Sequence, residues 1–249
     1  MKRLSLSIFM ILVSLTQMAP LAFAKVPPTK VKDEMDKFMT PFLKKSGWNE
    51  FLKKHTSQND SSFVRAEEYP VEIDGEKAIV GLGFRSVHIS AKPQTVVAIV
   101  NDPKYFQSLY GLDKPANIST VKADGTFDAR IFKIVPGVEN QDFTLNYQGH
   151  WEGPSWIGQA KMVKDEKNFA LRNNIKMVEP QGDGSVYREI ALFYPLRWWL
   201  KLFPGTVQKI TKTEMAKLNK TIKCASEKVS RGEEMSDEIG KTCFTEASK

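Results

Sequence analysis

The chain has 249 residues, of which 41% are hydrophobic and 26% are charged, and its formal net charge is +7 at pH 7. This length accommodates one large domain or two small ones. The composition is ordinary for a globular protein, which excludes disorder for most of the chain. After the first segment, no stretch is long and apolar enough to predict a membrane span.

Residues 1–24 predict a secretory signal peptide. Lys2 and Arg3 precede a largely apolar run over residues 4–15, and residues 22–24 read Ala-Phe-Ala, a small-x-small cleavage pattern. An uncleaved membrane anchor is the alternative, but the run is short for a span of about 20 residues. Cleavage lowers the net charge from +7 to +5. We therefore expect an exported protein, either periplasmic or secreted.

Residues 25–47 are predicted to form a linker followed by a helix. Apolar side chains recur at helical spacing over residues 31–42, with lysines and acids between them. Pro41 is expected to end or kink this helix, because proline lacks the N–H that a helix interior needs. A second short helix is expected after Gly47. The main domain is predicted to extend over residues 48–232.

From residue 63 to residue 193 the chain is predicted to be mainly antiparallel strands. Asp74-Gly75 separates two β-like runs and predicts a hairpin. Two short helices follow, one from Pro93 and one from Asp102-Pro103. About six strands are then expected, because apolar and polar residues alternate between turn signals. The clearest alternation covers residues 143–151.

The longest helix is predicted near the C-terminus. Residues 206–231 contain neither glycine nor proline, and their apolar residues recur on one side. The predicted fold class is therefore α+β, in which a curled antiparallel sheet grips this C-terminal helix and further helices lie at the N-terminus. We expect the interior between sheet and helix to stay open as a pocket.

The two cysteines, Cys224 and Cys243, are predicted to form a disulfide. An exported chain meets an oxidising compartment, where an even pair of cysteines usually bridges. Two free thiols are the alternative. Residues 233–249 are expected to form a polar tail that is held to the last helix only through Cys243.

Three segments, residues 84–106, 132–148 and 187–219, resemble the START and Bet v-like (SRPBCC) superfamily of helix-grip proteins, as does the order of elements. The second segment contains Gln-Asp-Phe at residues 141–143 where START proteins have Arg-Asp-Phe, so the arginine is missing. The resemblance covers residues 48–224, from which we delimit a START-like domain at residues 48–232. It implies a gated tunnel between sheet and last helix that binds sterols, phospholipids, quinones or polyketides without a cofactor.

Polar residues on two strands are candidates for contact with a ligand head group. Asn173 and Glu189 fall in register with apolar residues that could face the tunnel, and a buried amide or carboxylate must find partners. Satisfaction by neighbouring strands or solvent is the alternative. Arg85 and Arg188 are weaker candidates. The predicted ligand-binding residues are Phe84, Phe143, Leu145, Tyr147, Asn173, Ile175, Glu189, Trp198, Val207 and Ile210.

The segment before the last helix combines aromatic and basic residues and predicts a membrane contact. Its predicted membrane-facing residues are Arg197, Trp199, Lys201 and Phe203, since tryptophan suits a membrane interface. The alternative is that these residues fill the end of the core. Residues 197–231 contain nine basic and two acidic residues. A lysine stripe within them suits anionic lipid or is simply a solvated face; its members are Lys209, Lys212, Lys220 and Lys223.

The sequence favours an exported protein that binds a lipid or another hydrophobic ligand, with lipid transfer between membranes as its use. A cyclase- or hydrolase-like enzyme with Glu189 or His88 as acid or base is one alternative, and a filled-core interaction domain is another. The three histidines have no metal-ligand spacing, so no metal site is expected. Nucleic acid is not an expected partner because the chain is exported and lacks a binding module. The oligomeric state is left open.

Overall fold

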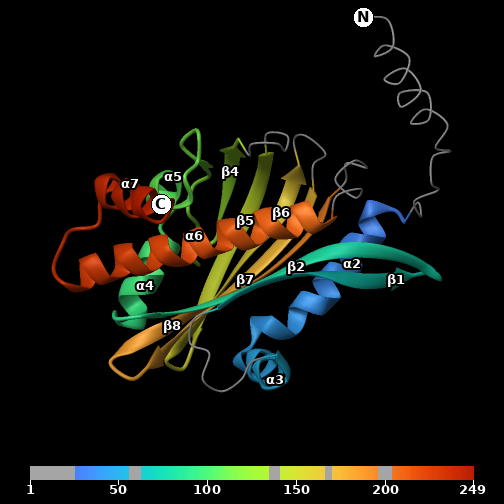
Figure 1. Ribbon diagram of the computed structural model, residues 1–249, viewed down its shortest axis with the longest axis horizontal. Helices are drawn as coiled ribbons and strands as arrows, with labels where there is room; N and C mark the ends of the chain where they lie inside the picture. Colours follow the sequence, from blue (N-terminus) through green and yellow to red (C-terminus); the bar gives the residue numbers. More distant parts are fainter. Residues whose placement is uncertain (1–25, 56–62, 135–140, 166–169, 196–203) are drawn as a thin grey trace, which may run out of the picture.

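The computed structural model describes residues 26–55, 63–134, 141–165, 170–195 and 204–249 (Figure 1). Within them an eight-stranded sheet has the order β1-β2-β8-β7-β6-β5-β4-β3. All its strand pairs are antiparallel, and β8 lies between β7 and β2 and pairs with both. The strands are β1 (Phe63–Ile73), β2 (Glu76–Ile89), β3 (Asn117–Ile118), β4 (Phe127–Lys133), β5 (Gln141–Glu152), β6 (Ser155–Asp165), β7 (Ala170–Gln181) and β8 (Gly184–Pro195).

Helices cover both faces of this sheet. They are α2 (Pro28–Met39), the 3-10 turn η1 (Thr40–Leu43), α3 (Lys45–His55), α4 (Pro93–Val100), the 3-10 turn η2 (Pro103–Tyr105), α5 (Phe106–Tyr110), α6 (Pro204–Ser230) and α7 (Asp237–Glu246). The predicted α+β class is confirmed. The short strand β3 and the helix α7 were not expected from the sequence.

Helix α6 crosses one face of the sheet and lies over β1 and β2 (Figure 1). Met215 of α6 approaches Gly83 of β2 so closely that a Cβ at this glycine would lie 2.6 Å from the methionine methyl carbon. Ile222, further along α6, packs in a buried cluster with Val87 of β2 and Val96 of α4. The predicted grip of a sheet on the C-terminal helix is therefore confirmed.

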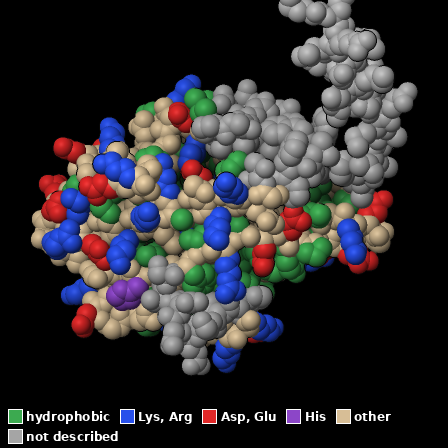
Figure 2. All heavy atoms as spheres, in the orientation of Figure 1, with side chains coloured by type: hydrophobic (Ala, Val, Ile, Leu, Met, Phe, Trp, Pro, Cys, Tyr) green, Lys and Arg blue, Asp and Glu red, His purple; other side chains and the backbone are tan. Residues whose placement is uncertain are grey.

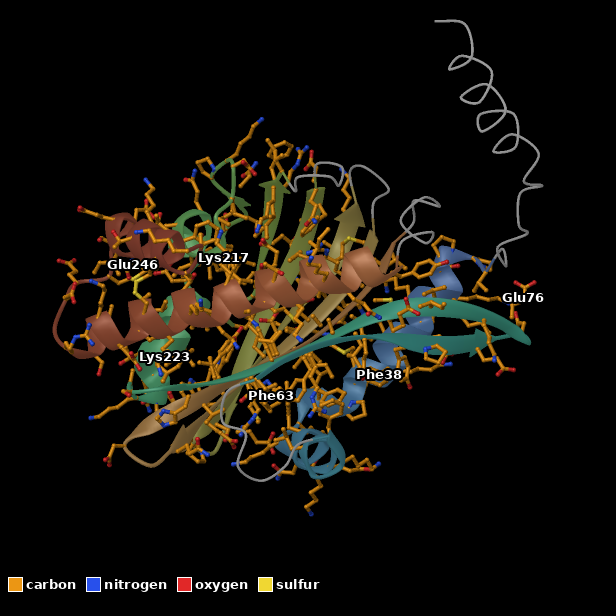
Figure 3. All side chains as sticks on the ribbon, viewed as in Figure 1. Phe38, Phe63, Glu76, Lys217, Lys223 and Glu246 are labelled. Carbon is orange, nitrogen blue, oxygen red and sulfur yellow. A yellow bond between two sulfur atoms is a disulfide. The ribbon has the colours of Figure 1, made fainter. Side chains whose placement is uncertain are left out.

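The N-terminal helices α2 and α3 cover the opposite face of the sheet. Trp48 of α3 is fully buried, and its Nε1 donates a hydrogen bond of 2.8 Å to the carbonyl oxygen of Phe42. Phe38 and Phe63, both labelled in Figure 3, belong to the same layer, where the Phe63 ring lies 4.8 Å from that of Phe84. The central strands are consequently buried on both faces.

Two tight turns have a left-handed backbone, and the first of them is the hairpin that the sequence predicts. Asp74 and Gly75 have φ angles of 53° and 80°, which suits the tight hairpin between β1 and β2. Helix α5 ends at Gly111, whose φ of 56° places it in the left-handed region that terminates many helices.

The C-terminal segment is more ordered than predicted. The disulfide between Cys224 and Cys243 is confirmed, with Cα atoms 5.7 Å apart. Residues 237–246 form the helix α7, whose N-terminus is capped by the Ser236 side chain. Gly240 of α7 lies against Ser108 of α5, where an added Cβ would meet the serine oxygen at 2.4 Å. The prediction that Cys243 alone holds this segment is therefore wrong.

No helix among the described residues is long and apolar enough to cross a membrane. The predicted signal peptide at residues 1–24 lies outside the described residues. The same holds for Trp198, Trp199, Phe203, Arg197 and Lys201.

Candidate functional site

A buried charge pair lies between the sheet and α6. Arg85 of β2 and Glu189 of β8 occupy opposite positions on adjacent strands, and they are 1% and 5% exposed. The Nε of Arg85 donates a hydrogen bond of 2.9 Å to Oε2 of Glu189, and its Nη2 contacts the same oxygen. The strand register thus places two opposite charges in contact inside the protein, where each would be costly alone.

Neutral side chains complete this network. Tyr187 donates from its hydroxyl to Oε2 of Glu189 at 2.7 Å, and Asn174 donates to Oε1 at 3.0 Å. Asn219 of α6 accepts from Nη1 of Arg85 at 3.3 Å and donates to the Ser86 carbonyl at 3.1 Å. Asn219 therefore fixes the position of α6 over β2.

The charges of the pair shift each other's titration. Burial alone would raise the pKa of Glu189, but the charge of Arg85, assisted by that of Lys176, holds this pKa below its ordinary value of 4.5. Burial raises the pKa of Tyr187 well above 10.0, despite the opposing charge of Arg85. Arg85 and Glu189 are consequently both charged at neutral pH, and Tyr187 stays a neutral donor.

The α6-facing side of β7 and β8 is incompletely covered. On this side the partly exposed residues are Arg172, Asn174, Ala191 and Phe193. On the opposite side of the same strands the neighbouring residues are buried, namely Asn173, Ile175, Ile190 and Leu192. The described side chains of α6 before Met215 are also partly or fully exposed. The described side chains of α6 before Met215 are therefore less buried than Met215 itself, which packs closely on Gly83.

A lysine lies at the inner end of this incompletely covered strip. Lys176 of β7 is 6% exposed, and its Nζ donates a hydrogen bond of 3.1 Å to the hydroxyl oxygen of Tyr110 of α5. The same Nζ lies 5.5 Å and 5.6 Å from the ring centroids of Tyr110 and Tyr147. Burial raises the pKa of Tyr147 well above 10.0, so this ring is uncharged.

The predicted ligand-binding residues divide between the two faces of the sheet. Glu189 lies on the α6 side, and so do Phe143, Leu145 and Tyr147, which are buried in a cluster with Phe106 of α5. Ile210 of α6 is partly exposed, and the side chain of Val207 is not among those described. For residues on the α6 side, a role in ligand binding remains a prediction.

Three predicted ligand-binding residues lie on the other face. Phe84 and Ile175 belong to the buried cluster beneath α2 and α3. Asn173 donates to Asp36 of α2 at 3.0 Å and accepts from Gln159 of β6 at 2.9 Å. Their predicted place beneath α6 is wrong, because an apolar alternation identifies a buried side of a strand but not which layer covers it. Of the weaker candidates, Arg85 lies at the centre of the network beneath α6.

Two small cavities are also found on the α2 and α3 side. One borders Asp36, Lys161 and Asn173, and the other borders Phe51 and Phe84. Each has a volume of about 10 Å³, which is room for about one water molecule. Neither cavity suits a lipid chain.

The two candidate acid–base residues, His88 and Glu189, do not lie together. His88 follows Arg85 by three positions on β2 and so lies on the opposite side of that strand from Glu189. Glu189 is held as a carboxylate by its partners, which makes it a poor proton donor. No group of three or more His, Cys, Asp or Glu side chains in the described part of the chain is placed to hold a metal ion.

No protein-family model and no curated protein matches the sequence. Solved structures that are similar include a STAR-related lipid transfer protein from Xanthomonas axonopodis, at 14% identity and a TM-score of 0.49, covering 67% of this chain and 96% of that one. Human STARD10 is similar at 10% identity and a TM-score of 0.44, over 69% of this chain and 79% of its own.

The Zhui aromatase/cyclase from Streptomyces sp. R1128 is also similar, at 9% identity and a TM-score of 0.48, over 61% of this chain and 97% of its own. The strand order and the helix placement described above, rather than these likenesses, confirm the predicted α+β architecture of a sheet that grips its C-terminal helix.

Proposed function

We propose that this protein binds a lipid or another hydrophobic ligand between the sheet and the stretch of α6 before Met215. The observation that carries the proposal is the incomplete cover of β7 and β8 beneath α6, on strands whose other side is buried. Ala191 and Phe193 supply apolar surface there. A mostly apolar site with a few placed polar groups is typical of small-molecule binding.

Export is part of the same proposal. The first 24 residues have the pattern of a cleaved signal peptide. The disulfide between Cys224 and Cys243 supports it, because such bonds persist in oxidising compartments. We place the mature protein in a periplasm or outside the cell.

A bound lipid is the first expected result. Native mass spectrometry of the mature protein, purified from its export compartment, should show a discrete added mass that extracts into organic solvent. A bare protein that also takes up no lipid from vesicles would contradict the proposal and favour a filled-core interaction domain.

Filling the strip beneath α6 should prevent uptake. Each CH₂ group that stays in water instead of being buried costs about 0.8 kcal/mol. The indole of Ala191→Trp is expected to displace at least two such groups and so to weaken lipid binding about tenfold. Binding is measured by titration of a fluorescent lipid.

The matched control is Val163→Trp, since Val163 is 58% exposed on β6. This variant adds the same indole on the surface and should bind lipid as the unaltered protein does. Equal loss in both variants, or no loss in either, would argue against a site between sheet and α6.

We also propose that the protein takes up its lipid from a membrane or delivers it to one. Lys209, Lys212 and Lys220 are exposed on α6 and form no ion pair within the described part of the chain. Figure 2 shows basic side chains spread along this helix. Each lysine near an anionic membrane surface contributes about 1 kcal/mol. We propose that this face of α6 meets anionic lipid while a lipid enters or leaves.

Charge removal on α6 should therefore weaken vesicle binding. Replacing Lys209, Lys212 and Lys220 by glutamine is expected to reduce binding to phosphatidylserine vesicles roughly tenfold or more, without loss of fold. Flotation at physiological salt measures it.

The control carries the same three changes at exposed lysines on other elements, Lys53, Lys77 and Lys122. It has the same net charge but an intact α6. If both variants lose vesicle binding equally, net charge and not the α6 face is responsible.

A further inference from the structure

The α6 side of the sheet buries more positive than negative charge. Four charged side chains of the described residues are buried, namely Arg85, Asp142, Lys176 and Glu189. Asp142 alternates with Phe143 on β5 and so faces away from α6, where Arg130 contacts it at 2.9 Å. Two buried cations and one buried anion remain beneath α6. A buried charge without a partner is costly, so the excess cation calls for an anion.

Glu189 does not serve as that anion for Lys176. Its Oε2 accepts from Arg85 and Tyr187, and its Oε1 accepts from Asn174. Lys176 stands opposite Glu189 in the strand register and lowers its pKa at a distance, but forms no hydrogen bond or ion pair with it. Arg85 is therefore neutralised within the protein, and Lys176 is not.

Lys176 has unused donors. An ammonium has three N–H groups, and the hydroxyl of Tyr110 is the acceptor for one of them among the described residues. That hydroxyl is itself engaged with the Val100 carbonyl at 3.5 Å. The faces of the Tyr110 and Tyr147 rings stabilise the cation by cation–π attraction, but they do not replace an oxygen acceptor for its N–H groups.

The surroundings show from which side an acceptor could come. Asn174 and Arg172 precede Lys176 at two-residue spacing on the same side of β7, and both are partly exposed. Basic and amide groups thus lead from the incompletely covered strip to the buried ammonium. An acceptor that enters beside the apolar Ala191 and Phe193 reaches Lys176 at the inner end.

We propose that the hydrophobic ligand carries an anionic head group, a carboxylate or a phosphate, which accepts hydrogen bonds from Lys176. This inference rests on the proposed lipid-binding function and names its ligand class. The chain of the ligand lies along Ala191 and Phe193 beneath the stretch of α6 before Met215. Its head group supplies the missing negative charge.

The test compares ligands that differ only in the head group. The mature protein is loaded with a fluorescent fatty acid, and palmitate, monopalmityl phosphate and palmityl alcohol are used as competitors. We expect palmitate or monopalmityl phosphate to bind about tenfold or more tightly than palmityl alcohol, since an anionic head group accepts a charge-assisted hydrogen bond from Lys176. Tighter binding of palmitate indicates a fatty acid as the ligand, and tighter binding of monopalmityl phosphate indicates a phospholipid. Inorganic phosphate alone, as a further competitor, shows whether the chain is needed.

Variants then assign the preference to one side chain. Lys176→Met should lower the affinity for the anionic ligand about tenfold or more and leave the affinity for the alcohol unchanged. Lys176→Arg should retain the preference for the anion. Lys161→Met is the matched control, because Lys161 pairs with Asp36 on the opposite side of the sheet. Circular dichroism and urea unfolding check each variant. The comparison of acid with alcohol on the unaltered protein decides the matter even where a variant fails to fold.

The outcomes separate this inference from the function on which it rests. Equal affinity for the alcohol and both anions, with no effect of Lys176→Met, overturns the anionic head group but leaves lipid binding intact. Absence of binding by any chain-bearing competitor overturns the proposed function itself. A preference for the anion that survives in Lys176→Met assigns it to another cation and overturns the role of Lys176.

Discussion

The Arg85→Met variant should lose about 3–5 kcal/mol of its free energy of unfolding at pH 7. The substitution leaves Glu189, which is 5% exposed, as a buried carboxylate without its cation. Tyr187 and Asn174 still donate to it, but neutral donors do not replace a charge. Asn219 of α6 also loses its contact with the guanidinium. Urea unfolding followed by circular dichroism measures the loss.

Removing both charges is the control for this result. The double variant Arg85→Met/Glu189→Met replaces the pair by apolar side chains and is expected to recover most of the stability. A double variant as unstable as Arg85→Met alone would show that shape and hydrogen bonds, not the unpaired charge, cause the loss.

The pH dependence of the difference in unfolding free energy between Arg85→Met and the unaltered protein is a second check on the charge explanation. In the unaltered protein the pKa of Glu189 lies below its ordinary value of 4.5, so its contribution to stability is present above 4.5 and is lost as the pH falls through the lowered pKa. Without Arg85, burial dominates and raises this pKa. The variant then gains relative stability when Glu189 takes up a proton, and its difference from the unaltered protein should shrink from pH 7 to pH 4. A constant difference would contradict the charge explanation.

The elements could be predicted because their signals are local. The Asp74-Gly75 turn, the alternation on β5 and the glycine-free pattern of α6 each depend on a few neighbouring residues. The disulfide could be predicted from the number of cysteines and the predicted signal peptide alone. The helix α7 was missed because its sequence is polar and short, and its position depends on contacts with α5.

The site was harder to predict because it depends on which layer covers which side of a strand. On β7 the apolar residues Ile175 and Met177 face α2 and α3, whereas the polar residues Asn174 and Lys176 face α6. An amphipathic strand normally turns its polar side to water, so Lys176 had no reason to be considered buried.

Two signals for the site were nevertheless in the sequence. Asn219 falls between Met215 and Ile222 at helical spacing, on the side of α6 that the apolar pattern identifies as inward. Arg85 and Glu189, which carry opposite charges, both lie on strands that the sequence predicts. What the residues alone could not give is the long-range pairing of β2 with β8, which brings the two into contact.

Loss of the disulfide should lower the free energy of unfolding by about 3 kcal/mol. The bond joins Cys224 of α6 to Cys243 of α7 across a sequence separation of 19, and closing such a loop restricts the unfolded chain. The variant Cys224→Ser/Cys243→Ser is compared with the oxidised protein by urea unfolding. The same oxidised protein after treatment with a reductant serves as the control for the substitutions themselves.

Proteolysis tells whether the bond acts only on the unfolded chain or also holds α7 in place. Glu233 and Glu234 are exposed between α6 and α7 and offer a site for a glutamate-specific protease. Cleavage there should release α7 from the double serine variant but leave it attached to the oxidised protein. Phe244 of α7 lies against Gly111, and Lys217 of α6 stands 3.5 Å from its ring centroid. If α7 stays bound after cleavage of the variant, these contacts are sufficient and the disulfide stabilises the fold through the unfolded chain alone; if α7 is released, the bond also secures the helix that supports α5 and, through Tyr110, the position of Lys176.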